Sequence, residues 1–153
     1  MAVDVFISFD NEDAAAVDGF RSISSNPNHK LHFNDNSLKE PVTDAAGRPI
    51  RALPDDPKSE PVKQEIEKMM QDSTRLIVLV GKDTHSSEWV KWEIEKFHGM
   101  KAAEGEQNGA RRILVMRLKG EESASLPPEL ETKACKTIGW DPDEVHRWLE
   151  ETV

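Results

Sequence analysis

The sequence has one cysteine, no apolar run longer than five residues and fewer basic than acidic side chains. The single cysteine, Cys135, excludes an intramolecular disulfide and a cysteine-cluster metal site. The longest apolar run, residues 76–80, is too short to cross a bilayer. The net charge of −9 repels nucleic-acid phosphates and anionic membrane surfaces. We therefore expect no nucleic-acid partner and no membrane partner.

The first residues also lack the features of a secretory signal. Residues 1–9 run directly into a β-branched, apolar pattern, without a basic segment or a small-residue cleavage site. A chain of 153 residues has the usual size of one domain. We expect a single domain over residues 1–153 and a cytoplasmic location.

Apolar, β-branched segments alternate along the chain with segments of helical periodicity. Strands are predicted at residues 3–9, 31–35, 75–80, 112–118 and 135–138, and helices at 13–24, 59–73, 87–104 and from 141 onward. In the first helix, Ala16, Val17 and Phe20 are expected to face the core. The alternation predicts the α/β class, with an open, mainly parallel five-stranded sheet and helices on both faces.

Residues 36–58 depart from this regular pattern. They include four prolines and one glycine without clear periodicity, and a loop of this length in a compact domain is usually functional or disordered. The carboxyl ends of parallel strands share one edge of the sheet, so Phe9, Asp35 and Gly81 are expected to converge there. We expect the long loop to cover that edge, with a tolerated surface insertion as the alternative.

Glu93 is the most informative residue, because it lies where a core residue is expected. When residues 87–104 are wound as a helix, Glu93 falls inside an apolar arc formed by Trp89, Val90, Ile94, Phe97 and Met100. Desolvation there raises the pKa of a carboxylate, as is typical of acid–base and charge-stabilising groups. A boundary glutamate paired with a lysine is the alternative. Trp92 lies outside the arc, which favours contact with a partner over packing under a loop.

Several common active-site motifs are missing from the sequence. No strand is followed by G-x-G-x-x-G, no G-x-S-x-G marks a nucleophilic serine, and no histidine pair has H-E-x-x-H spacing, so we expect no metal. Gly81-Lys82-Asp83-Thr84 lacks the upstream glycine of a phosphate-binding loop. The third strand ends at Val80 without the acceptor aspartate of a phosphorelay receiver. A Rossmann-type dinucleotide site, a phosphate-binding loop and a phosphorelay receiver are therefore disfavoured.

Five segments, taken together, match the pattern of a known family. They are Val5-Phe6-Ile7-Ser8-Phe9, Asp35, Leu76-Ile77-Val78-Leu79-Val80, Ser87-Glu88-Trp89-Val90-Lys91-Trp92-Glu93-Ile94 and Ile138-Gly139-Trp140. Over nearly the whole chain they resemble the TIR-like family. The resemblance is greatest to the bacterial and archaeal branch that includes the TIR proteins of Thoeris antiphage defence, in which a tryptophan–valine pair precedes the glutamate in the same way.

This resemblance implies a flavodoxin-like TIR fold and an enzyme that cleaves NAD at the nicotinamide–ribosyl bond. The helix glutamate is essential in enzymatic TIR domains, which gives that role to Glu93. Trp89 matches the aromatic residue that packs beside the substrate, and Phe9 matches the residue that lines the nicotinamide pocket. Weaker candidates for substrate binding near the same edge are Ser8, Asp10 and Asp35. NAD is then the substrate, and no separate cofactor is implied.

The resemblance also implies products and partners. Capture by water gives ADP-ribose, and capture by an atom of the same molecule gives a cyclic ADP-ribose. Members of the similar branch often make a cyclic nucleotide signal for a separate effector protein, and many enzymatic TIR domains work only as oligomers, which implies self-association. Two features depart from the family pattern. Asp10 stands where many TIR domains carry a basic or polar residue, and the loop at residues 36–58 is longer than usual.

A non-enzymatic TIR-type interaction module is the competing interpretation. The long loop and Trp92 then form the binding surface. Glu93 favours the enzyme, because an adaptor has no use for a carboxylate whose burial lowers stability. A mononucleotide-binding protein of the flavodoxin type is disfavoured, because Asp10, Glu12 and Asp13 follow the first strand and repel phosphate.

Overall fold

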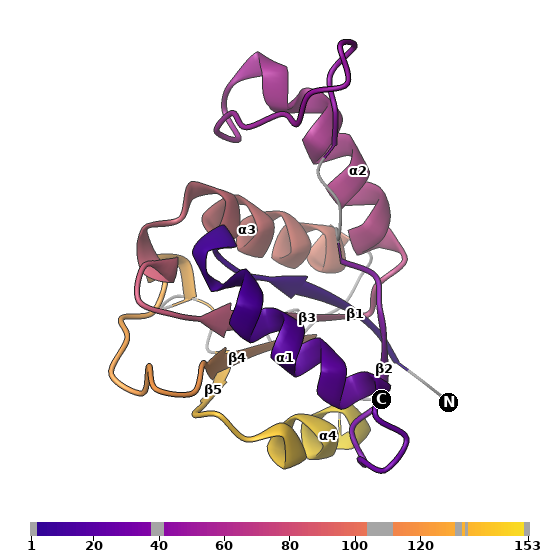
Figure 1. The fold of residues 1–153 in the computed structure, drawn as a ribbon, viewed down its shortest axis with the longest axis vertical. Coiled ribbons are helices and arrows are strands. Elements are labelled where there is room, and N and C mark those ends of the chain that lie inside the picture. The colour runs from indigo at the N-terminus through magenta and orange to yellow at the C-terminus, as the bar shows by residue number, and fades with distance from the viewer. Residues whose placement is uncertain (1–2, 38–41, 104–111, 131–132, 134, 152–153) are drawn as a thin grey trace.

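The computed structural model describes residues 3–37, 42–103, 112–130, 133 and 135–151. An open sheet lies at its centre, and its described strands are β1 (Val3–Ser8), β2 (Phe33–Asp35), β3 (Arg75–Val80), β4 (Ile113–Arg117) and β5 (Lys136–Ile138). The strand order is β2-β1-β3-β4-β5, and all of these pairings are parallel (Figure 1). The predicted five-stranded α/β sheet is confirmed, and among the described strands it is parallel throughout.

Helices cover both faces of this sheet. They are α1 (Ala14–Ser25), α2 (Glu60–Gln71), α3 (Glu88–Ala103) and α4 (Pro142–Glu151), with single 3₁₀ turns at Asn11–Asp13, Pro57–Ser59, Thr84–Ser86 and Pro128–Leu130. In Figure 1, α3 lies on the opposite side of the sheet from α1 and α4. None of the helices within the described ranges is long and apolar enough to span a membrane.

The alternation of side chains along β1 divides the core into two parts. Val5 and Ile7 pack toward α1 and α4, whereas Phe6 packs toward α2 and α3. The first part buries Val17, Phe20, Val145, Trp148 and Leu149 of the helices, and the second buries Val62, Ile66, Met70, Val90, Ile94 and Phe97. Because helices cover both faces, β3 is buried at every position, and residues 76–80 form a continuous apolar run after Arg75.

The start of α1 differs from the prediction. Ala16 was expected to face the core, but it is exposed together with Ala14 and Ala15. The 3₁₀ turn before α1 carries the chain away from β1, and burial against the sheet begins at Val17, which is fully buried. Helical periodicity assigned the face correctly but did not locate the first turn that reaches the sheet.

Gly81 directly follows β3 and allows the chain there to approach Asp13, which lies in the 3₁₀ turn after β1. Its amide donates a hydrogen bond to Thr84 Oγ1 over 2.8 Å, and a Cβ added here would lie 2.3 Å from Asp13 Oδ2. We expect Gly81→Ala to lower the free energy of unfolding by about 1–3 kcal/mol, measured by urea denaturation. Gly99→Ala is the control, since a Cβ there meets no described atom within 4 Å. The control should be stabilised by about 0.5–1 kcal/mol, and equal effects of the two changes would contradict this account.

Candidate active site

A cavity of about 550 Å³ opens at the carboxyl ends of β1 and β3. The sheet order places β2 on one side of β1 and β3 on the other, so the connections that follow β1 and β3 lead in opposite directions. In open α/β sheets, ligands bind in the crevice at such a reversal of strand order. The volume also lies within the usual range for small-molecule sites. This cavity is therefore the candidate active site.

Glu93 lines this cavity from α3 and is held there by a residue of β1. Only 8% of Glu93 is exposed, and its Oε1 accepts a hydrogen bond from Ser8 Oγ over 2.8 Å. Ser8 is the last residue of β1 and lies on the same side of the strand as Phe6, the side that α3 covers. No lysine or arginine among the described residues pairs with Glu93, so the alternative of a boundary ion pair is not found.

The surroundings of Glu93 change its acidity. Burial raises the pKa of Glu93 to about 8, and the hydrogen bond from Ser8 opposes part of that rise. Val90, Ile94 and Phe97, on the same helix, are fully buried, which keeps water away from this side of α3. The burial and the raised pKa expected from the helical pattern are confirmed. A carboxyl group with this pKa gains or loses its charge close to neutral pH.

Two aromatic side chains contribute to the walls of the cavity. Phe9 follows β1 directly, and the guanidinium carbon of Arg21 lies 5.4 Å from the centre of its ring. Trp89 lies one turn before Glu93 on α3 and makes an edge-on contact with Trp92, with ring centres 5.7 Å apart. The structure thus brings Phe9, Trp89 and Glu93 into one cavity.

Trp92 packs within the chain. Besides its contact with Trp89, its ring lies 5.9 Å from the Lys63 ammonium, and the side chain is partly buried against the core on the α2 and α3 side. The intramolecular alternative therefore describes Trp92 better than the partner contact that the sequence favoured. The reason is that Lys63 of α2 contacts the Trp92 ring, and a helical wheel of α3 alone does not contain that contact.

Residues 50–53, which we call the strap, border the cavity from the long loop. Ile50 and Leu53 line it together with Val42, and Ile50 N donates to Val42 O over 2.9 Å. The indole Nε1 of Trp89 donates a hydrogen bond to Ala52 O over 2.9 Å, which ties the strap to α3. The expected covering of the sheet edge by the long loop is confirmed only for Val42, Ile50 and Leu53, since residues 43–49 do not line the cavity. Residues 38–41 lie outside the described part of the chain.

The hydrogen bond from Trp89 Nε1 to Ala52 O is expected to limit the local opening of the strap. Trp89→Phe keeps an aromatic ring in the wall but removes the donor to Ala52 O, a bond of typical net value about 1 kcal/mol. We expect the amides of Ile50 and Asp56 to exchange about fivefold faster, as measured by hydrogen exchange. Amides of the buried strand β3 serve as the internal control and should be unaffected. Unchanged exchange at Ile50 and Asp56 would show that the bond does not hold the strap.

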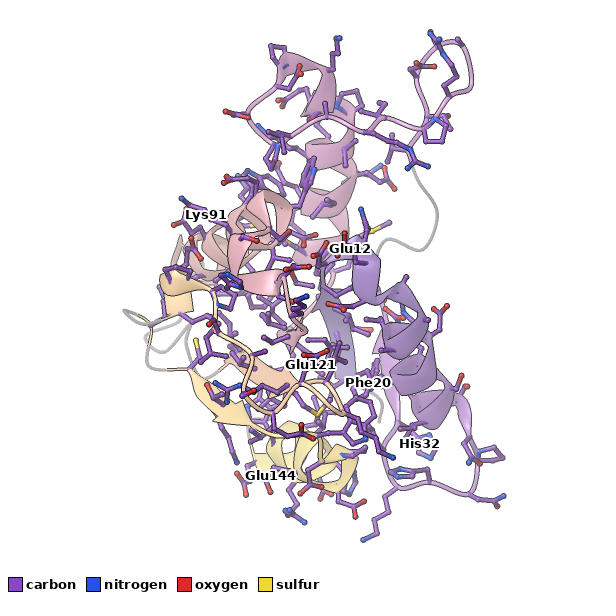
Figure 2. The ribbon with its side chains drawn as sticks, turned by 60° about the vertical axis from the view of Figure 1, so that its left-hand side comes forward. Glu12, Phe20, His32, Lys91, Glu121 and Glu144 are labelled. Atoms are coloured by element: carbon purple, nitrogen blue, oxygen red, sulfur yellow. The ribbon has the colours of Figure 1, made fainter. Side chains whose placement is uncertain are left out.

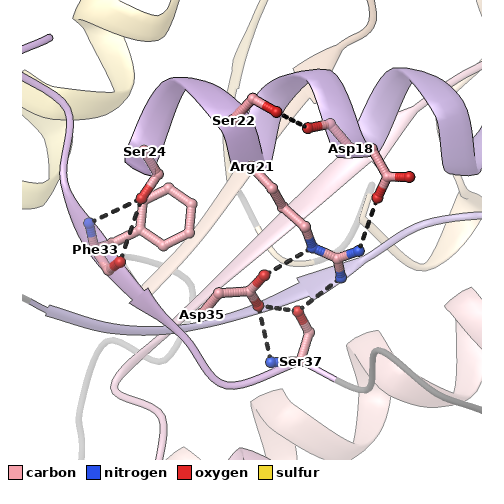
Figure 3. A network of polar contacts seen from close by, with 7 residues as sticks. All are labelled: Asp18, Arg21, Ser22, Ser24, Phe33, Asp35 and Ser37. Atoms are coloured by element: carbon pink, nitrogen blue, oxygen red, sulfur yellow. Dashed lines mark hydrogen bonds and ion pairs between the residues drawn. The ribbon is translucent and has the colours of Figure 1, made fainter. Parts of the chain in front are cut away.

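Asp35 does not line the cavity. Its Oδ2 accepts a hydrogen bond from Arg21 Nε over 2.7 Å, and its Oδ1 accepts one from Ser37 N over 3.0 Å (Figure 3). The register pairs Asp35 with Val5, and Val5 faces α1. Asp35 therefore lies near the edge that the sequence predicted but on the face away from Glu93. Its link to the cavity is indirect, through Arg21, which also lies over the ring of Phe9.

Acidic side chains surround the mouth of the cavity. Asp10, Glu12, Asp83 and Glu88 all line it, and we call these four residues the acidic rim. A hydrogen bond with Asp83 and repulsion from Asp83 and Asp10 raise the pKa of Glu12. Figure 2 shows Glu12 beside the start of α1, far from Glu144 on α4. Asp10 was a sequence candidate, whereas Asp83 was missed because the sequence places it in an incomplete phosphate-loop motif.

The described part of the chain contains no cluster of side chains suited to bind a metal ion. No group of three or more histidine, cysteine, aspartate or glutamate side chains there is arranged to hold one. The arrangement of the rim carboxylates therefore does not indicate a metal site.

The open parallel sheet, with a buried helix glutamate at the reversal of strand order, is consistent with a TIR-like domain, and the family comparison shows that class. Residues 6–123 match the family described as Thoeris protein ThsB, TIR-like domain, and the chain belongs to that family. The match includes all six sequence candidates, which are Ser8, Phe9, Asp10, Asp35, Trp89 and Glu93. No curated protein matches the chain.

Proposed function

We propose that this TIR-like domain is an enzyme that cleaves NAD at the bond between nicotinamide and ribose. One observation carries the proposal. The carboxyl group of Glu93 is buried, hydrogen-bonded by Ser8 on one oxygen, and lines a cavity of about 550 Å³ at the strand-order reversal. Burying a carboxyl group without an ion-pair partner lowers stability, and perturbed acidic groups in cavities concentrate at functional sites.

The proposed reaction places positive charge next to Glu93. The bond between ribose C1′ and the nicotinamide nitrogen breaks, and its electron pair leaves with nicotinamide, which becomes a neutral molecule. In the empty protein Glu93 is mostly protonated at neutral pH, and the cationic substrate beside it favours the ionised form. That carboxylate then stabilises the positive charge that develops at C1′, more strongly than in water because the surroundings are of low dielectric constant. Ser8 holds the carboxylate in one orientation. Phe9 and Trp89 bound the space beside the departing ring.

The second step decides the product. Attack by water at C1′ gives ADP-ribose and releases a proton, whereas attack by a nucleophilic atom of the adenine end closes a ring and gives a cyclic ADP-ribose. The strap narrows the access of water because Ile50 and Leu53 border the cavity. Membership of the Thoeris ThsB family supports a role in antiphage defence. We further propose that the product is a signal for a separate effector protein and that self-association controls activity.

Incubation of the purified chain with NAD tests the proposal. Products are separated by liquid chromatography and identified by mass, with and without a crowding agent that promotes self-association. We expect nicotinamide release together with ADP-ribose or a cyclic form lighter by one water, and we expect these products to form about 10²–10³ times more slowly with Glu93→Gln. Intact NAD under both conditions, with a folded protein, would contradict the proposal and favour the interaction module.

A further inference from the structure

The charged side chains that line the cavity all have the same sign. The acidic rim (Asp10, Glu12, Asp83 and Glu88) and Glu93 contribute five carboxyl groups, and no lysine or arginine among the described residues lines the cavity. None of the four rim residues forms an ion pair within the described ranges. Their charges are therefore left for solvent or for a ligand to compensate.

The carboxyl groups of the rim influence one another's acidity. A hydrogen bond with Asp83, followed by repulsion from Asp83 and Asp10, raises the pKa of Glu12. Asp13, just outside the rim, has its pKa raised by burial and by repulsion from Asp10. The negative charges of the rim repel one another in the empty protein, and a positively charged ligand relieves that repulsion.

Glu93 provides a second, independent indication at the inner end of the cavity. More than nine tenths of this residue is buried, and its hydrogen bond from Ser8 occupies Oε1 only. Among the described residues no hydrogen-bond donor contacts Oε2, and the residue lines the cavity. An oxygen in this position accepts a hydrogen bond from, or faces the charge of, whatever enters.

We propose that the acidic rim selects ligands by charge, drawing in the cationic N-substituted nicotinamide ring and keeping phosphate groups outside the cavity mouth. This inference rests on the proposed function and specifies which part of the substrate the cavity recognises. Nicotinamide bound to ribose carries a positive charge on its ring nitrogen, and the rim attracts it. Once the bond is broken, free nicotinamide is neutral and the attraction is lost, which favours release of this product. Phosphates of the dinucleotide are repelled by the rim and lie beyond it.

A pair of small probes separates charge from shape. 1-Methylnicotinamide is cationic and nicotinamide is neutral, while the two share the same ring and amide. Binding is followed at low ionic strength through the indole N–H resonance of Trp89. We expect the cation to bind about tenfold more tightly, and we expect the difference to shrink in 0.5 M salt because exposed charges are screened. Equal binding, or tighter binding of the neutral probe, would overturn the proposal.

Variants of the rim locate the source of the preference. Glu12→Gln combined with Asp83→Asn is expected to weaken binding of 1-methylnicotinamide by about threefold to tenfold and to leave binding of nicotinamide unchanged. Glu150→Gln is the matched control, because Glu150 is exposed on α4 and does not line the cavity. It should leave the affinity for both probes at the value of the parent protein. An unchanged preference in the double variant would refute a role of the rim.

The position of the phosphates is tested with larger ligands. Nicotinamide riboside and its 5′-phosphate differ only by the phosphate group, and Glu93→Gln protein keeps both intact during titration. We expect the riboside to bind about threefold to tenfold more tightly, whereas tighter binding of the phosphorylated form would place phosphate inside the rim and overturn the proposal.

The inference and the proposed function fail in different ways. Cleavage of NAD without a preference for the cation would remove only the role of the rim. A preference for the cation without cleavage of NAD would remove the proposed reaction and leave a charge-selective binding site.

Discussion

Glu93→Gln is expected to lower NAD turnover by a factor of about 10²–10³ while leaving the fold intact. Glutamine has nearly the same shape as glutamate, and its Oε1 can still accept the hydrogen bond that Ser8 Oγ donates over 2.8 Å in the parent protein. It carries no negative charge, so the positive charge that develops at ribose C1′ loses its stabilising partner in a poorly solvated cavity. Initial rates of nicotinamide release measure the effect, and circular dichroism verifies the fold.

Two further variants sharpen this experiment. Glu95→Gln changes the same residue type on the same helix, but Glu95 is exposed and does not line the cavity, so its rate should stay within about twofold of the parent. Ser8→Ala removes the donor that orients Glu93 and should give a rate between those of the parent and Glu93→Gln. A Glu93→Gln protein as active as the parent would exclude Glu93 from the reaction.

The same substitution is expected to stabilise the protein at alkaline pH. The pKa of Glu93 is raised from 4.5 in its ordinary state to about 8 in the folded protein. Below pH 4.5 the group is protonated in both folded and unfolded chains. Between pH 4.5 and 8 the unfolded chain releases the proton and the folded chain keeps it, so rising pH favours unfolding. Relative to Glu93→Gln, the parent should lose up to about 5 kcal/mol across this window.

Urea denaturation of the parent and of Glu93→Gln at pH 5, 7 and 9 measures this effect. Other groups with shifted pKa values, such as Asp13 and His98, are present in both proteins, so their contributions largely cancel in the difference. The advantage of Glu93→Gln should grow from pH 5 to pH 9. A difference that does not vary with pH would show that Glu93 is already ionised in the folded protein at pH 5.

Together the two results would show that one residue lowers stability and supports turnover. A carboxyl group that is kept in a cavity at the expense of stability is typical of sites where function and stability oppose each other. If Glu93→Gln stabilises the fold without affecting NAD, the buried carboxyl group has some other use, and the charge-selective binding of cations becomes the leading interpretation.

The sequence by itself determined the fold class and the burial of Glu93 among apolar side chains. Periodicity of 2 in the strands and 3.6 in the helices depends only on local backbone geometry, so it identified the sheet, its helices and the apolar arc around Glu93. The order of apolar segments along the chain predicted a parallel sheet, because a helix must carry the chain back between parallel strands. These features depend on neighbours in the sequence, and the sequence displays such neighbours directly.

Only the tertiary structure decided which distant residues meet. Ser8 and Glu93 are 85 positions apart and become hydrogen-bonded because α3 packs on the face of β1 that carries Ser8. Asp35 lies at the same edge, but its pairing with Val5 turns it toward Arg21 and away from the cavity. The strap and the single sign of charge around the cavity likewise arise from segments far apart in the chain. Local patterns fix the face of each element, whereas register and packing between elements determine which faces share a site.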